Sequence, residues 1–138
     1  MPYAGDLPPA AAYDLLAVRP DAVLVDVRTR AEWSYVGGPD LGALANRVLQ
    51  IEWVTFPGGA RNEGFLDELA AAGVAKDAPV IFLCRSGVRS VAAAEAATAA
   101  GLGPAYNVLE GFEGPPDGAG HRGVAGGWRA AGLPWRQT

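Results

Sequence analysis

Cys84, the only cysteine of the chain, stands between a short apolar run and a polar loop. The run covers residues 80–83, and two arginines follow Cys84 before an alanine-rich stretch begins at Val91. This order predicts a strand, a tight loop and the start of a helix, an arrangement whose backbone N–H groups gather anions. A thiol in such a loop is expected to be a nucleophile. The candidate active-site loop comprises Cys84, Arg85, Ser86, Gly87, Val88, Arg89 and Ser90.

The spacing of this loop suggests the size of the anion it holds. Four residues separate Cys84 from Arg89, which gives the pattern C-x4-R. Cysteine-dependent phosphatases use a similar cradle with one more residue, which widens the ring for a tetrahedral phosphate or arsenate. The shorter loop is expected to fit a persulfide on Cys84 itself. Gly87 is expected to supply the left-handed backbone that so tight a turn needs, and Ser90 to offer a hydroxyl donor and to cap the following helix.

Charged residues near the loop have more than one interpretation. Arg85 is the better candidate for binding an anionic donor, whereas Arg89 either contacts substrate or braces the loop through backbone carbonyls. Asp26 is expected mainly to accept hydrogen bonds that order the neighbouring loops. Arg28 is expected to pair with Glu32 or another carboxylate, and both Asp26 and Arg28 are also placed to tune the field at Cys84.

The single histidine and four of the aromatic residues are expected to have no catalytic role. His121, the only histidine, lies in a glycine-rich stretch and is interpreted as an exposed side chain. Four aromatic side chains are expected to pack in the core or to line the pocket mouth: Trp33, Tyr35, Trp53 and Phe112.

Composition favours one packed domain over residues 1–138. Half of the residues are hydrophobic and 19% are charged, which is enough for a core. The net charge of −4 gives no support for binding nucleic acid. A lone cysteine excludes an internal disulfide and fits a reducing compartment. Neither a signal peptide nor an apolar run of membrane-spanning length is present, so we expect a cytoplasmic location and no membrane contact.

Apolar runs and turn residues predict the order of the elements. Strands are predicted at residues 22–27, 79–83 and 105–109, and helices at 8–17, 29–34, 62–70, 91–100 and within 128–135. Asn62 is the predicted N-cap of the third helix, with glycines ending the third and fourth. Residues 47–56 are either a short strand or irregular, and residues 113–127 are predicted to be loop. The alternation of helices and strands predicts an α/β protein with a mostly parallel sheet.

Several motifs together resemble a single-domain rhodanese. They are Val25-Asp26-Val27-Arg28, the loop from Cys84 to Ser90, Leu109-Glu110-Gly111-Phe112, and Trp128 near the end. The resemblance implies a five-stranded parallel sheet with helices on both faces. Many members of that family carry a Gly-His-Ile-x-Gly-Ala stretch, whereas this chain has no histidine in residues 36–43. In that family the stretch is mainly structural, so the difference concerns the rim of the pocket and not the chemistry of the cysteine.

The implied activity is transfer of a sulfane sulfur from a small anionic donor such as thiosulfate to cyanide or a thiol. A Cys84 persulfide would be the intermediate, and no metal or organic cofactor is expected. Two alternatives remain at this stage. One is a persulfide carrier or regulatory module that serves a protein partner, and the other is a phosphatase or arsenate reductase.

Overall fold

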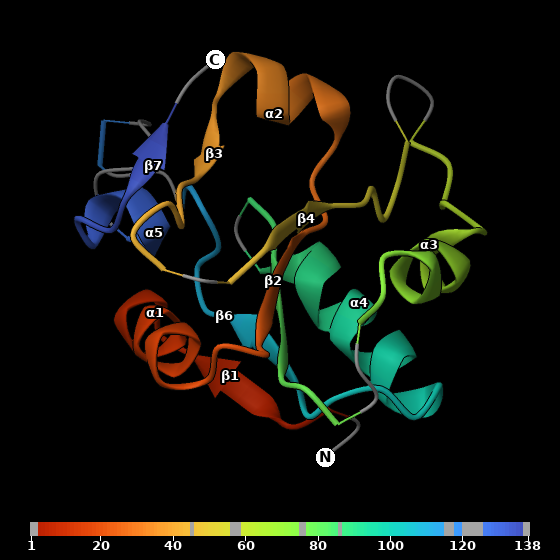
Figure 1. Ribbon diagram of the computed structural model, residues 1–138. Helices are drawn as coiled ribbons and strands as arrows, with labels where there is room; N and C mark the ends of the chain where they lie inside the picture. Colours follow the sequence, from red (N-terminus) through yellow and green to blue (C-terminus); the bar gives the residue numbers. More distant parts are fainter. Residues whose placement is uncertain are drawn as a thin grey trace.

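A five-stranded parallel sheet forms the centre of the computed structural model (Figure 1). From edge to edge its strands are β1 (Gly5–Leu7), β6 (Ala105–Val108), β5 (Val80–Leu83), β2 (Val23–Asp26) and β4 (Val48–Gln50). Every residue of β2 and β5 is buried, because helices cover both faces of the sheet there. The structure describes residues 3–44, 46–55, 59–74, 77–85, 87–114, 118–119 and 126–136.

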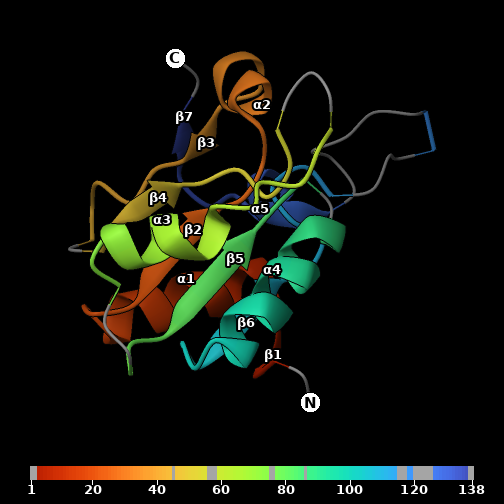
Figure 2. The ribbon, with the colours of Figure 1, turned by 90° about the vertical axis from the view of Figure 1, so that its right-hand side faces the viewer.

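Helices cover the two faces of the sheet in pairs. The first face carries α1 (Pro9–Val18) and α5 (Gly127–Ala130), and the opposite face carries α3 (Phe65–Ala71) and α4 (Val88–Ala99) (Figure 2). Leu16 and Trp128 fill the core on the first face, and Phe65 and Phe82 fill it on the second. Burying one such side chain contributes about 1.5–3 kcal/mol. No helix in the described part of the chain is long and apolar enough to cross a bilayer.

A smaller layer closes the carboxyl end of the sheet. It consists of α2 (Arg30–Tyr35) and an antiparallel pair formed by β3 (Gly38–Pro39) and β7 (Trp135–Arg136). Thr29 and Glu32 form a capping box at the start of α2, in which each side chain bonds the backbone of the other residue. This cap fixes the N-terminus of α2 shortly after the end of β2.

The predicted α/β class and five-stranded parallel sheet are confirmed. The undecided segment 47–56 contains β4 and an isolated bridge between Val54 and Arg61. The prediction that Asn62 caps α3 is wrong, because its side chain accepts a hydrogen bond from Gly64 N–H in the preceding turn and Gly64 is the cap. The prediction that Ser90 caps α4 is also wrong, because this helix already begins at Val88.

Candidate active site

The cysteine loop lies at the carboxyl end of the parallel sheet. Cys84 follows the last residue of β5, and Asp26 ends the neighbouring strand β2. Because parallel strands end at the same edge, the loops that follow them meet there. Gly87 caps α4 with a φ of 117°, a backbone conformation that glycine adopts without a steric penalty. The left-handed backbone expected at Gly87 is therefore confirmed.

The Cys84 thiol sits at the boundary between this loop and the core. Its Sγ accepts a hydrogen bond from Gly87 N–H at 3.0 Å and lies 3.2 Å from Ser90 Oγ. The residue also belongs to the apolar cluster between the sheet and helices α3 and α4, and only 1% of it is exposed. Polar groups thus contact the sulfur on the side of the loop. Because the sulfur is buried, the residues around it must move before a substrate can reach it.

Arg89 is held by Glu32, which lies on α2. Two hydrogen bonds of 2.7 and 3.0 Å join its guanidinium to the two carboxylate oxygens. Burial raises the pKa of Glu32, but hydrogen bonds from Arg89 and from the backbone of Thr29 outweigh burial and lower this pKa from 4.5 to about 2. Burial lowers the pKa of Arg89, and the hydrogen bonds and charge of Glu32 outweigh it and raise that pKa. The ion pair therefore keeps both groups charged and ties α2 to the cysteine loop.

Asp26 and Arg28 form a second ion pair that is fully buried. Arg28 Nε and Nη2 donate to the two carboxylate oxygens of Asp26 at 2.9 and 2.7 Å. Nη2 also donates to Gly37 O at 2.6 Å, and the guanidinium lies 4.3 Å from the ring centre of Phe112. The expected pairing of Arg28 with Glu32 is not observed, because Glu32 pairs with Arg89, and the other carboxylate that Arg28 binds is Asp26. The pair braces the turn after β2 against the segment that leads into β3.

A chain of hydrogen bonds leads from the thiol across β6 to β1. Ser90 Oγ donates to Asn107 Oδ1 at 2.5 Å, and Asn107 Nδ2 donates to Asp6 Oδ1 at 3.0 Å. Tyr3 OH donates to the same Asp6 oxygen at 2.8 Å. Asp6 and Asn107 could not be found from the sequence, because only the register of β1 against β6 brings them opposite each other. For Glu32 a signal existed, since the spacing of Thr29 and Glu32 is that of a capping box.

The segment after β6 holds the cysteine loop in place through backbone hydrogen bonds. Phe112 N–H donates to Cys84 O at 2.7 Å, and Glu113 N–H donates to Arg85 O at 3.0 Å. A Cβ at Gly111, whose φ is 61°, would collide with the backbone of Cys84 and Arg85. This close approach explains why a glycine occupies that position.

The other predicted loop residues lie at the surface or outside the described part of the chain. Arg85 is exposed, and 80% of Val88 is exposed. Ser86 and His121 lie outside the described residues. No group of three histidine, cysteine, aspartate or glutamate side chains that could hold a metal occurs among the described residues.

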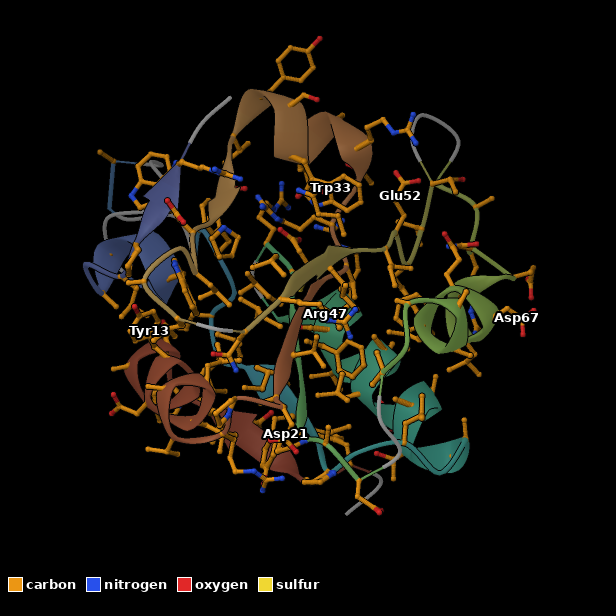
Figure 3. The ribbon with its side chains drawn as sticks, in the orientation of Figure 1. Tyr13, Asp21, Trp33, Arg47, Glu52 and Asp67 are labelled. Atoms are coloured by element: carbon orange, nitrogen blue, oxygen red, sulfur yellow. The ribbon has the colours of Figure 1, made fainter. Side chains whose placement is uncertain are left out.

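The four aromatic residues play different parts. Trp53 packs edge-on against Phe65 with ring centres 5.0 Å apart, and Phe112 is fully buried. Tyr35 is 81% exposed, so it is not a core residue. Trp33 points from α2 toward β4 (Figure 3) and lines a cavity.

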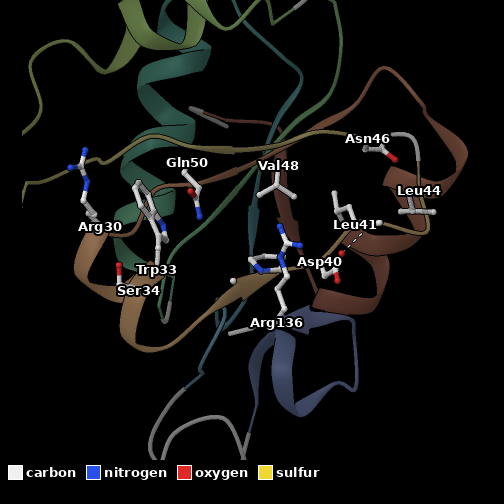
Figure 4. A pocket seen from close by; sticks show the side chains of 13 residues that line it. Arg30, Trp33, Ser34, Asp40, Leu41, Leu44, Asn46, Val48, Gln50 and Arg136 are labelled. Carbon is white, nitrogen blue, oxygen red and sulfur yellow. Dashed lines mark hydrogen bonds between the residues drawn. The ribbon is translucent and has the colours of Figure 1, made fainter. Parts of the chain in front are cut away.

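This cavity of about 850 Å³ lies beside the edge strand β4, and the cysteine loop is not among its described lining residues. Trp33 and Gln50 lie on one side of it, and Arg136 extends into it from β7 on the other (Figure 4). The Trp33 indole N–H is buried and has no hydrogen-bond partner in the described structure. Among the described residues, the thiol and this cavity are therefore separate features.

Comparison with known proteins identifies relatives over almost the whole chain. A protein-family model described as the STR4 middle domain matches residues 8–138. An uncharacterized protein of Rickettsia conorii is 39% identical over 126 residues, which cover 91% of each chain. An uncharacterized protein of Rickettsia prowazekii is 36% identical over the same share.

Solved structures share the architecture. The Mycobacterium tuberculosis protein Rv0390 is 56% identical and superposes with a TM-score of 0.90 over 99% of both chains. A polysulfide-sulfur transferase homodimer from Wolinella succinogenes is 25% identical, with a TM-score of 0.64 over 96% of this chain and 78% of its own. A Rhodopseudomonas palustris protein described as a possible tyrosine phosphatase is 24% identical, with a TM-score of 0.58 over 96% of this chain and 85% of its own, and shows the fold alone. The fold is thus the rhodanese-like one that the sequence predicted.

Proposed function

This chain belongs to the family of the STR4 middle domain and has a rhodanese-like fold, and we propose that it is a sulfurtransferase that works through a persulfide on Cys84. The observation that carries the proposal is the environment of Sγ. A backbone N–H from Gly87 is directed at the sulfur within a loop one residue shorter than a phosphate cradle. Arg89, in the first turn of α4, contributes a positive charge to the same loop, and Glu32 fixes its position. These features favour a small anion centred on the cysteine.

The first half-reaction loads the cysteine. The Cys84 thiol loses its proton to water, and the thiolate attacks the outer sulfur of thiosulfate. The sulfur–sulfur bond of the donor breaks, and sulfite leaves with the bonding electron pair. A persulfide anion remains on Cys84, where the Gly87 N–H stabilises negative charge.

The second half-reaction transfers the outer sulfur from the Cys84 persulfide to the acceptor. Cyanide or a thiolate attacks the terminal sulfur of the persulfide, and the bond to Cys84 Sγ breaks. The products are thiocyanate or a new persulfide, together with the regenerated Cys84 thiolate. Two half-reactions that share one covalent intermediate predict ping-pong kinetics without a cofactor.

The donor is proposed to be a small inorganic anion. Arg85 follows the thiol directly and is exposed, so its positive charge can attract such a donor. Thiosulfate is the first candidate. Polysulfide is the second, because a neighbour of similar fold is a polysulfide-sulfur transferase. We place the reaction in the cytoplasm, where a free thiol and thiol acceptors coexist.

Two other functions remain to be distinguished. A persulfide carrier would accept sulfur from the donor but release it to a specific protein rather than to cyanide. A phosphatase with the same type of loop is disfavoured by the spacing of Cys84 and Arg89, which leaves the cradle one residue short.

The test is steady-state turnover with thiosulfate and cyanide, measured as thiocyanate formation. Wild-type protein is expected to turn over with parallel double-reciprocal plots, and Cys84→Ser to be inactive. Ser34→Ala, which changes an exposed hydroxyl on α2, is the matched control and should keep full activity. Loading without release to cyanide would indicate the carrier, and aryl-phosphate hydrolysis that depends on Cys84 would support the phosphatase instead.

A further inference from the structure

The hydrogen-bonded chain beyond Ser90 connects the buried thiol to the protein surface. Ser90 and Asn107 are 0% and 2% exposed, whereas Asp6 at the far end is exposed. The links are the Ser90–Asn107 bond of 2.5 Å and the Asn107–Asp6 bond of 3.0 Å. The mechanism proposed above uses neither Asn107 nor Asp6.

The carboxylate of Asp6 determines the direction of every bond in this chain. An ionised carboxylate only accepts hydrogen bonds, so the group of Asn107 that faces Asp6 must be its NH2. The carbonyl oxygen of Asn107 therefore faces Ser90. A carbonyl oxygen has no proton to donate, so the single hydroxyl proton of Ser90 must point at Asn107.

The sulfur consequently faces the lone pairs of Ser90 and not its proton. The contact of 3.2 Å between Cys84 Sγ and Ser90 Oγ is then a hydrogen bond only if the S–H group donates it. A thiolate in the same place would face an oxygen lone pair. For Ser90 to donate to a thiolate, its hydroxyl must first turn away from Asn107 and break the 2.5 Å bond.

We propose that Asn107, oriented by Asp6, is a positioning residue that directs the Ser90 hydroxyl away from Cys84 and holds the resting cysteine as a thiol. For Ser90 to stabilise the thiolate, the hydroxyl must rotate from Asn107 to the sulfur when the thiol proton leaves to water. After that rotation, the same hydroxyl also serves a persulfide anion. The role in sulfur transfer rests on the proposed function, but the effect on the thiol does not.

Other groups around Cys84 act in the opposite direction. Gly87 N–H donates to Sγ, and the cation of Arg89 lies nearby, although Glu32 pairs with it. Arg85 is the exposed cation of the loop.

From β2, the carboxylate of Asp26 is neutralised by the guanidinium of Arg28. From β1, Asp6 accepts a hydrogen bond from Tyr3, and this bond raises the pKa of Tyr3. The Asn107–Ser90 bond thus opposes a loop that otherwise favours the anion, and removing it should release that preference.

The test is the formation of the Cys84 thiolate as a function of pH, followed by its ultraviolet absorbance. The chain has a single cysteine, so the signal is unambiguous once the spectrum of Cys84→Ser is subtracted. Asn107→Leu, which is similar in shape but has no acceptor, frees the Ser90 hydroxyl to donate to the thiolate. The acid dissociation constant of the Cys84 thiol is expected to rise about tenfold, because the variant thiolate gains one hydrogen bond from Ser90.

The Ser90→Ala background distinguishes positioning from a general effect of packing. In that background, Asn107→Leu is expected to change nothing, because no hydroxyl remains to be released. A tenfold effect that persists without Ser90, or the absence of any effect in its presence, would overturn the proposal.

Asp6→Ala is a surface substitution that tests the same idea without changing the core. Without the carboxylate, the Asn107 amide can turn over and present its NH2 to Ser90, so the ionisation constant should rise as well. An unchanged constant would refute the assigned role of Asp6. Both measurements are valid even if the protein transfers no sulfur, so failure of this proposal and failure of the proposed function are distinguishable.

Discussion

Replacing Glu32 with glutamine isolates the contribution of the ion pair with Arg89. Glutamine at this position still closes the capping box with Thr29, so the start of α2 keeps its cap. What is lost is the negative charge opposite the guanidinium, at oxygen–nitrogen distances of 2.7 and 3.0 Å. The variant therefore leaves a half-buried Arg89 without its counter-charge.

The pKa of Glu32 sets the magnitude and the pH range of the effect. Folding lowers the pKa of Glu32 from 4.5 to about 2, and the corresponding upper limit on the stabilisation is about 3 kcal/mol, at ~1.36 kcal/mol for each tenfold change in the dissociation constant. Because about one-fifth of each side chain is exposed to screening solvent, we expect about 1–2 kcal/mol. The folded-state pKa lies below the unfolded one, so the stabilisation is fully present above pH 4.5 and is lost as the pH falls toward 2.

The assay is urea unfolding of wild type and Glu32→Gln from about pH 7 to about pH 2. The difference in unfolding free energy should be 1–2 kcal/mol at about pH 7 and less than half of that at about pH 3. Thr98→Ala is the control, since it removes a hydroxyl that donates to the backbone carbonyl of Ala94 and not to a carboxylate, and its effect should not vary with pH. A Glu32→Gln difference that is the same at both ends of the range would refute the reasoning.

Three further substitutions test other parts of the account. Arg85→Gly should raise the KM for thiosulfate more than the KM for mercaptopyruvate in steady-state assays, and unchanged values for both would show that Arg85 does not bind the donor. Gly87→Ala forces a side chain into a φ of 117° and should cost about 1–3 kcal/mol in urea unfolding, which an unaltered midpoint would contradict. Asp26→Ala leaves the buried Arg28 unpaired and should cost about 3–5 kcal/mol in thermal unfolding. A loss below 1 kcal/mol would show that solvent or another group compensates the charge.

The strands that could be predicted from sequence are those buried on both faces. Such strands must be apolar at every position, so β2 and β5 stand out as continuous runs. The shorter strands β1, β3 and β7 have two or three residues each and no such run. Their hydrogen-bonded partners define them, and those partners are known only once the chain has folded.

The same distinction applies to the candidate site. Cys84 and its loop are contiguous in sequence, so residue type and spacing were enough to predict a strand, a tight turn and a helix. The side chains that act on the loop come from far away. Glu32 lies 57 residues from Arg89, and Asp6 lies 101 residues from Asn107. Their roles depend on strand order and helix placement, which no local pattern contains.

The most direct test of the central claim is the mass of the intact protein after incubation with thiosulfate. If Cys84 carries the transferred sulfur, the wild-type chain gains the mass of one sulfur atom, cyanide removes it again, and Cys84→Ser never gains it. A wild-type chain whose mass stays unchanged, or an adduct that also forms on Cys84→Ser, would contradict the account.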